Sequence, residues 1–277
     1  MGRVTQRRRV VRIDAAGVRT SGPDSLAVEE PLEIRVAGSS YAVAMRTPGH
    51  DIELAHGFLH AEGVIGGRDD VLTARYCAGA VTNAGTRERQ NTYNVLDIAL
   101  APGVPTPDER RSRSMSSACG TCGTATIEAL ALSGRHDLRA DTTTVEARVL
   151  ASLPDRLREQ QAVFAKTGGL HAAGLFTAAG EPLCAREDVG RHNAVDKVVG
   201  WALLEARDLT GTVLQVSGRA SFELVQKAYL AGIPVLSAVS APSSLAAETA
   251  DEVGLTLAGF VRHGGLALYA HDGRVRV

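Results

Sequence analysis

The second half of the chain alternates segments of strand character with segments of helix character, and this order limits the possible folds more than any other feature. Apolar runs between turn residues predict the strands, and apolar residues spaced along one helical face predict the helices. The expected order is strand 212–217, helix 221–231, strand 233–240, helix 243–251, strand 254–262 and a last strand 266–271. Such alternation is typical of a parallel or mostly parallel sheet covered by helices. We therefore expect an α/β fold in this half.

Three further elements are expected just before this alternation. They are strands 170–176 and 181–187, joined by the turn Ala178-Ala179-Gly180, and a helix over 193–206. The preceding stretch, 130–168, has a helical pattern that Pro154 is expected to break, because proline lacks the amide hydrogen that a helix needs. We expect residues 131–277 to form a three-layer C-terminal domain.

The first part of the chain mixes strand and helix signals and predicts a smaller mixed domain over 1–130, so that the protein is α+β overall. Residues 32–45 alternate as strands do, and 91–100 do the same. Asp51 is in the position to cap a helix over 52–61. The first twenty residues hold six arginines and one aspartate, which predicts a solvated basic tail that leads into a first strand.

Composition excludes several classes of protein. With 277 residues, of which 44% are hydrophobic and 22% charged, the chain has enough apolar material for a large core. A net charge of -1 argues against a nucleic-acid binder whose whole surface is basic. No stretch resembles a secretory signal or a membrane-spanning helix, so we expect a cytoplasmic protein that enters no membrane.

Two of the four cysteines lie close together in a long loop, 101–123, which contains three prolines. Cys119 and Cys122 share a glycine-flanked turn directly before a helical run, and several arginines precede them. A helix N-terminus and nearby cations favour the thiolate, which is the reactive form of cysteine. The spacing alone fits sulfur transfer, redox exchange through a disulfide, or a structural role.

Metal chemistry is disfavoured by the residues that surround these motifs. A zinc knuckle would need two more ligands at matching spacing, and the sequence holds no second Cys-x-x-Cys. Zinc deaminases need a His-x-Glu and a later Pro-Cys-x-x-Cys, but here His171-Ala172-Ala173 has Ala173 in place of the glutamate, and Ser240-Ala241-Pro242-Ser243-Ser244 supplies no thiol. We expect no bound zinc, and we assign Cys77 and Cys184 to packing.

A dense group of charges lies at the start of the predicted helix 193–206. The segment from Arg186 to Lys197 contains seven ionisable residues around Gly190. Such density can be an ordinary solvated face, but a glycine turn that delivers Arg191, His192 and Asn193 to a helix N-terminus can also bind an anion or a partner.

Taken together, these motifs resemble the FdhD family, the sulfur carriers that formate dehydrogenases require for activity. The matching blocks are Arg46-Thr47-Pro48-Gly49, Glu53 to Leu59, the cysteine loop, Thr167 to Ala173, Arg186 to Lys197, Ser217 to Glu223 and Ser240 to Ala246. The resemblance implies a cytidine-deaminase-like C-terminal domain and a homodimer. It also implies that a cysteine desulfurase loads sulfur onto Cys119, with Cys122 assisting, and that the protein passes this sulfur to a bis(molybdopterin guanine dinucleotide) molybdenum cofactor.

Two other functions stay open beside the sulfur carrier. A dithiol oxidoreductase would cycle Cys119 and Cys122 between the thiol and disulfide forms. A chaperone without catalytic chemistry would only bind the cofactor.

The guanine nucleotide end of that cofactor is expected at the carboxyl ends of the parallel strands, where open α/β sheets bind ligands. GDP is a possible mimic of this end. The expected ligand residues are Ser217, Arg219, Ser240, Phe260, Val261, Arg262, His263, Gly264 and Gly265.

Overall fold

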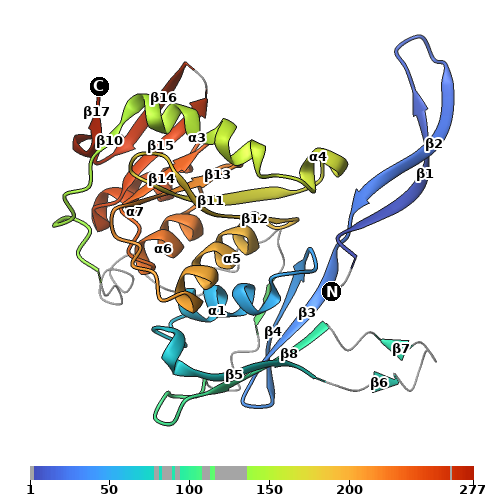
Figure 1. Cartoon of the computed structure of the whole chain (residues 1–277), viewed down its shortest axis with the longest axis horizontal. Coiled ribbons are helices and arrows are strands. Elements are labelled where there is room, and N and C mark those ends of the chain that lie inside the picture. Colours follow the sequence, from blue (N-terminus) through green and yellow to red (C-terminus); the bar gives the residue numbers. More distant parts are fainter. Residues whose placement is uncertain are drawn as a thin grey trace.

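The computed structural model describes residues 3–77, 81–82, 89–90, 94–107, 113–115, 136–262 and 264–277. Two larger sheets lie on either side of a pair of adjacent helices, α1 (Asp51–Ala61) and α5 (Arg191–Leu204), and a long hairpin stands apart from both sheets (Figure 1). No helix in the described ranges is long and apolar enough to span a membrane.

The larger sheet has six strands in the order β12-β11-β13-β14-β15-β16. Its strands are β11 (His171–Thr177), β12 (Pro182–Asp188), β13 (Thr212–Val216), β14 (Val235–Ala238), β15 (Thr256–Arg262) and β16 (Gly265–Ala270). The strands β13, β14 and β15 are parallel, which confirms the expected parallel core. The flanking strands β11 and β16 pair antiparallel with it, and β12 completes the expected hairpin with β11.

Helices cover both faces of this sheet and form three layers with it. On one face lie α5, α6 (Phe222–Leu230) and α7 (Ser244–Val253), which enclose the largest apolar cluster. On the other face α3 (Ala147–Glu159) buries Leu150, Leu153 and Leu157 against the sheet. Every residue of β13 and β14 is buried, as expected of strands with helices on both sides.

The helix before this sheet differs from the sequence expectation in two ways. It begins at Ala147, and the described residues 136–146 before it are not helical: residues 145–146 form a short strand, β10 (Val145–Glu146), which pairs in parallel with β17 (Val275–Arg276). Pro154 lies inside α3 and does not break it. Burial of the leucines on both sides of the proline stabilises the helix, and this offsets the loss of the hydrogen bond that the proline cannot make.

The smaller sheet has the strand order β5-β8-β3-β4-β9. Its strands are β3 (Glu30–Val36), β4 (Ser39–Arg46), β5 (Val71–Tyr76), β8 (Val95–Leu100) and β9 (Arg113–Met115). Part of the segment 101–123, which the sequence predicts as a loop throughout, is therefore a strand, because β9 adds in parallel to the edge of β4.

Short elements complete the chain. They are α4 (Phe164–Thr167), the 3-10 turns η1 (Arg68–Asp70) and η4 (Asp272–Arg274), and the two-stranded pair β6 (Val81–Thr82) and β7 (Arg89–Gln90).

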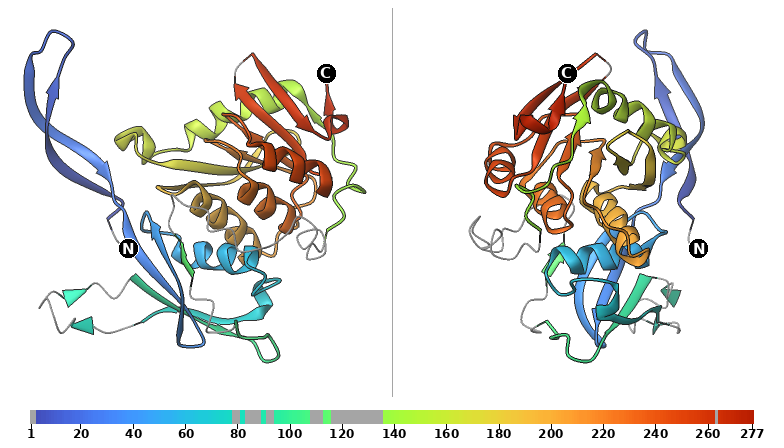
Figure 2. Two further views of the ribbon diagram at one scale, coloured as in Figure 1. Left: turned by 180° about the vertical axis from the view of Figure 1, so that it is seen from behind. Right: turned by 60° about the vertical axis from the view of Figure 1, so that its left-hand side comes forward.

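Two expectations for the N-terminal part are wrong in detail. Asp51 does not cap α1: it is the first helical residue, and the preceding His50 has a left-handed backbone with no capping side chain. The carboxylate of Asp51 instead binds the guanidinium of Arg46. The basic tail is not a tail, since β1 (Thr5–Ile13) and β2 (Arg19–Ala27) pair along their full length into a hairpin that projects from the molecule in every view (Figures 1 and 2).

Helices α1 and α5 pack in direct backbone contact through two glycines. A Cβ atom on Gly57 of α1 would lie 1.9 Å from the carbonyl oxygen of Asp196 in α5. A Cβ atom on Gly200 of α5 would lie 1.8 Å from the carbonyl oxygen of Glu53 in α1. Only glycine permits this approach, so the sequence fixes where the two helices cross.

Gly57→Ala is expected to destabilise the fold by about 1–3 kcal/mol or more, because the added methyl group overlaps backbone that cannot rotate away. Chemical denaturation measures the change in the free energy of unfolding. Gly273→Ala is the matched control, since a Cβ there has open space around it. Equal unfolding midpoints for the two variants would show that the helices do not depend on this close contact.

Candidate functional site

The carboxyl ends of the parallel strands meet at one edge of the six-stranded sheet, and most of the predicted cofactor-binding residues are found there. The amide of Ser240, after β14, donates to the carbonyl of Gly218, after β13, at 3.3 Å. The amide of Phe260 in β15 donates to the carbonyl of Ser240 at 3.2 Å. The structure therefore brings the three predicted strand ends together.

The N-termini of three helices reach the same edge. Strand β12 runs parallel to β13, because both are antiparallel to β11, so α5 begins at this edge as α6 and α7 do. Ser243 caps α7 by accepting a hydrogen bond from the amide of Ala246. The N-caps of α5 and α6, Gly190 and Ser221, make no such side-chain bond. The first-turn amides of these two helices give the edge a positive electrostatic character.

Basic side chains gather between these two helix N-termini, and we call His171, Arg191, His192 and Arg219 the basic cluster. Arg191 and Arg219 both contribute to lowering the pKa of His171, behind burial as the main cause. Gly218 lies against the ring, since a Cβ there would be 3.4 Å from Nδ1 of His171. The Nε of Arg191 is buried and has no hydrogen-bond partner. A buried guanidinium N–H without a hydrogen-bond acceptor, close to another cation, is suited to donate to an anionic ligand.

His192 is neutral in this setting. Burial lowers its pKa to about 3, with further contributions from Arg191, Lys227 and His171. Its Nε2 lies 3.0 Å from Oε2 of Glu223, a contact that would favour the charged ring, but the carboxylate is partly exposed and burial outweighs it. The short contact is best explained by a neutral ring whose Nε2 proton is donated to Glu223. The positive charge of the basic cluster at neutral pH therefore comes from the two arginines.

The turn between β15 and β16 forms the outer part of the edge. Phe260 has a left-handed backbone with φ of 51° and is 44% exposed, an unusual state for an aromatic residue in a strand. Gly264 and Gly265 have open space around them, and Arg262 is exposed. Val261, in contrast, is fully buried, so only its backbone can reach a ligand. His263 lies outside the described residues.

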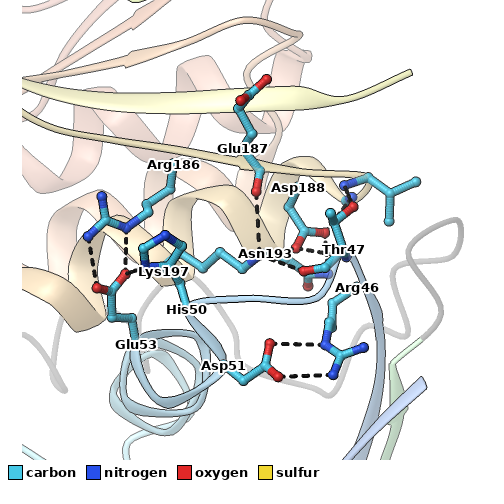
Figure 3. A network of polar contacts seen from close by, with 12 residues as sticks. Arg46, Thr47, His50, Asp51, Glu53, Arg186, Glu187, Asp188, Asn193 and Lys197 are labelled. Atoms are coloured by element: carbon cyan, nitrogen blue, oxygen red, sulfur yellow. Dashed lines mark hydrogen bonds and ion pairs between the residues drawn. The ribbon is translucent and has the colours of Figure 1, made fainter. Parts of the chain in front are cut away.

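The segment from Arg186 to Lys197, which the sequence left open between a solvated face and a binding site, divides into two parts. Arg191 and His192 belong to the basic cluster. Asp188, Asn193 and Lys197 are buried and form, with Thr47, a network that we call the polar junction (Figure 3).

The polar junction is built around an ion pair. The Nζ of Lys197 lies 2.6 Å from Oδ2 of Asp188 and donates to the carbonyl of Thr47 at 2.9 Å. The amide of Thr47 donates to Asp188, and Asn193 donates to the carbonyl of Met45 and to Asp188. The junction thus joins the β4–α1 connection to the β12–α5 connection.

Two further ion pairs lie beside the junction (Figure 3). The Nη2 of Arg46, which is buried, lies 2.9 Å from Oδ2 of Asp51. Arg186 binds both carboxylate oxygens of Glu53, at 2.5 and 2.8 Å. No sequence pattern indicates that Arg46 and Thr47 face the segment around Asp188, because these partners are far apart along the chain.

The predicted sulfur-bearing residues, Cys119 and Cys122, lie outside the described residues. The two cysteines that the structure describes differ in exposure. Cys184 is buried, and burial raises the pKa of its thiol to about 12, which makes it a poor nucleophile. Cys77 is half-buried. Within the described ranges, no group of three or more His, Cys, Asp or Glu side chains is arranged to hold a metal ion.

Lys197→Met is expected to cost about 3–5 kcal/mol of unfolding free energy, because it leaves the buried carboxylate of Asp188 without its cation. Urea denaturation measures this loss. Lys166→Met, at an exposed position of α4, is the control and should leave stability almost unchanged. A cost below about 1 kcal/mol for Lys197→Met would contradict a stabilising role for the ion pair.

Comparison with known proteins connects this geometry to one family. The FdhD/NarQ family matches residues 27–276. A protein from Nocardia farcinica named sulfur carrier protein FdhD is 55% identical over 276 residues, which cover 99% of this chain and 96% of that protein. A protein of the same name from Thermoplasma volcanium is 43% identical over 279 residues, with coverage of 99% and 97%.

A crystal structure has the same fold. It is described as a formate dehydrogenase accessory protein from Desulfotalea psychrophila and superposes with a TM-score of 0.75 at 22% sequence identity. The superposition covers 99% of this chain and all of that one.

Proposed function

Because the chain belongs to the FdhD/NarQ family, we propose that it is a sulfurtransferase that carries persulfide sulfur to the molybdenum cofactor of a formate dehydrogenase. The observation that carries the proposal is the match of nearly the whole chain to proteins named as sulfur carriers, together with the Cys-x-x-Cys pair in this sequence. The chain would act in the cytoplasm, where reducing conditions keep thiols free.

In the proposed sulfur chemistry two thiols react one after the other. The thiolate of Cys119 attacks the outer sulfur of a persulfide on a cysteine desulfurase, which forms a persulfide on Cys119 and leaves a desulfurase thiolate. The thiolate of Cys122 then attacks Sγ of Cys119, which releases hydrosulfide for the cofactor and forms a Cys119–Cys122 disulfide. An external dithiol reduces this disulfide before the next cycle. The close spacing of the two cysteines supports this order of steps.

The cofactor is the substrate of this reaction, and its guanine nucleotide end would bind at the carboxyl edge of the six-stranded sheet. Arg191, Arg219 and the two uncapped helix N-termini suit the phosphates. The exposed ring of Phe260 offers a face for the guanine base, and Gly264 lets the backbone approach closely. Ser217 is already engaged, because its hydroxyl accepts a hydrogen bond from the amide of Ala172.

The C-terminal domain would then be a deaminase-like scaffold without deaminase chemistry. His171 begins a strand rather than a helix, and the residue two positions later is Ala173, which is fully buried, so the segment lacks the acid–base glutamate of a His-x-Glu motif. The absence of a Pro-Cys-x-x-Cys motif from the sequence supports the same interpretation.

A dithiol oxidoreductase is the main alternative, and a cofactor-binding chaperone without sulfur chemistry is the second. Each alternative would use only part of the proposed set of functional residues. The oxidoreductase would need only Cys119 and Cys122, and the chaperone would need only the carboxyl edge. The sulfur carrier is the function that requires both.

Cys119→Ala is expected to abolish activation of a formate dehydrogenase, because no other residue would carry the persulfide. Enzyme activity after co-expression with each variant measures this. Cys77→Ala is the matched control and should mature the enzyme as wild type does, because Cys77 is assigned to packing. Full activation by Cys119→Ala would exclude this residue as the sulfur carrier.

An Arg262→Ala, His263→Ala double variant is expected to bind GDP about tenfold more weakly than wild type, because hydrogen bonds to charged phosphates are lost. Isothermal titration calorimetry measures both affinities. Arg68→Ala, on η1 and away from the edge, should bind GDP with wild-type affinity. If the double variant binds as tightly as wild type, the turn after β15 is not part of the nucleotide site.

A further inference from the structure

The hairpin formed by β1 and β2, which we call the arm, reaches far beyond the rest of the chain. Its two strands of nine residues pair along their full length, which corresponds to a span of about 30 Å. The arm projects away from both larger sheets in all three views (Figures 1 and 2). It meets the body at its base, where a Cβ atom on Gly169 would lie 3.6 Å from that of Ala27. The turn at its outer end, residues 14–18, can therefore reach a surface that the body does not touch.

The outer end of the arm is apolar and exposed. Val11 is 56% exposed, Ile13 61% and Val18 57%, and the turn between the strands adds Ala15 and Ala16. A two-stranded hairpin has no core of its own in which such side chains could be buried. Exposed apolar side chains grouped at the end of a projecting element are typical of a surface that is covered on binding.

The arm also carries a positive charge that its own acidic residues do not neutralise. Residues 1–27 contain six arginines and two aspartates, and so carry a charge of +4. Both aspartates are engaged within the arm. Asp14 accepts hydrogen bonds from two amides of the turn, and Asp24 pairs with Arg12 at 3.0 Å. The other arginines therefore present their charge to whatever the arm meets.

The charge and the apolar side chains share one face of the arm. Arg7 and Arg9 lie on the same face as Val11 and Ile13, because side chains two positions apart in a strand point the same way. Arg19, which is opposite Ile13 in the second strand, belongs to this face too. We call it the basic face, and neither strand contributes an acidic side chain to it. Along it, the apolar side chains lie towards the outer end, with arginines beside and behind them.

This order of side chains suits the surface of an anionic membrane. The apolar end can enter the boundary between lipid headgroups and acyl chains, while the arginines meet the lipid phosphates. A nucleic acid would also attract the arginines, but it offers bases and phosphates rather than an apolar layer for three exposed aliphatic side chains. A folded protein partner would need a larger apolar contact than the end of one hairpin, since stable interfaces bury about 800 Å² on each side.

We propose that the arm is a peripheral membrane anchor, which holds the chain on bilayers that contain anionic phospholipids. Each arginine close to such a surface strengthens binding about fivefold, so the contact is reversible and weakens as salt is raised. Composition alone predicts no contact with a membrane, because it is judged by long apolar runs, and a hairpin enters the headgroup layer with only a few side chains.

Co-sedimentation of the full chain with lipid vesicles tests this proposal. We expect wild type to bind vesicles of phosphatidylglycerol and phosphatidylcholine, to bind them less as sodium chloride is raised, and to stay in solution with phosphatidylcholine alone. Val11→Asp with Ile13→Asp should weaken binding about tenfold or more, since two apolar side chains leave the bilayer and two negative charges face it. Arg7→Gln with Arg9→Gln should weaken it about twentyfold, because two cations are lost.

A matched control changes the same charge away from the arm. Leu72, on β5, is 67% exposed, and the last residue, Val277, is fully exposed. Leu72→Asp with Val277→Asp should bind anionic vesicles nearly as wild type does. Thermal unfolding should show the same midpoint for all three double variants, because every change is at an exposed position outside the core.

Fluorescence quenching reports whether the end of the arm enters the bilayer. The wild-type chain has one tryptophan, Trp201 in α5, and Ala16→Trp adds a second in the turn of the arm. With brominated acyl chains in the anionic vesicles, we expect quenching for Ala16→Trp and almost none for wild type.

Any of three results would overturn the proposal. They are a wild type that leaves anionic vesicles unbound, binding that survives the Val11 and Ile13 changes, and binding without quenching at position 16. A wild type that ignores vesicles but binds duplex DNA, with an affinity that the Arg7 and Arg9 changes abolish, would assign the arm to a nucleic acid instead.

Discussion

The close crossing of α1 and α5 is the contact on which the arrangement of the two sheets depends. At Gly57 and Gly200 the helix backbones touch, and a methyl group at either position would overlap a carbonyl of the other helix. One turn before Gly200, Lys197 reaches the carbonyl of Thr47 and the carboxylate of Asp188. Burial of an unpaired charge is very costly, so the crossing is stable only if this ion pair forms. The glycines set the distance between the helices, and the ion pair sets their register.

This constraint also shapes the candidate site. Asp188 ends β12, and α5 begins three residues later, so the buried carboxylate fixes the helix N-terminus at the edge of the sheet. Arg191 and His192 are thereby held beside Arg219. The same short segment thus contributes buried residues to the polar junction and the partly buried Arg191 and His192 to the proposed ligand site. Substitutions within it are expected to separate into two classes, those that unfold the protein and those that leave it folded without affinity for anions.

The sequence predicts the six-stranded sheet well because its signals are local. Apolar runs and turn residues mark each strand and helix from 212 to 271, and the rule for strand ends then places Arg219 beside Ser240. The errors occur where tertiary contacts decide the structure. Pro154 remains within a helix because the sheet binds the leucines around it, and Asp51 pairs with Arg46 rather than capping a helix. The polar junction could not be foreseen, since Lys197 and Thr47 are 150 residues apart in sequence.

Sulfur transfer, rather than disulfide exchange or cofactor binding alone, is the central claim of this account. The most direct test is the intact mass of the chain after incubation with a cysteine desulfurase and free cysteine. The account predicts a gain of one sulfur atom, which peptide mapping places on Cys119 and which is absent from Cys119→Ala. A chain that only interconverts between dithiol and disulfide, with no added sulfur under these conditions, would contradict it.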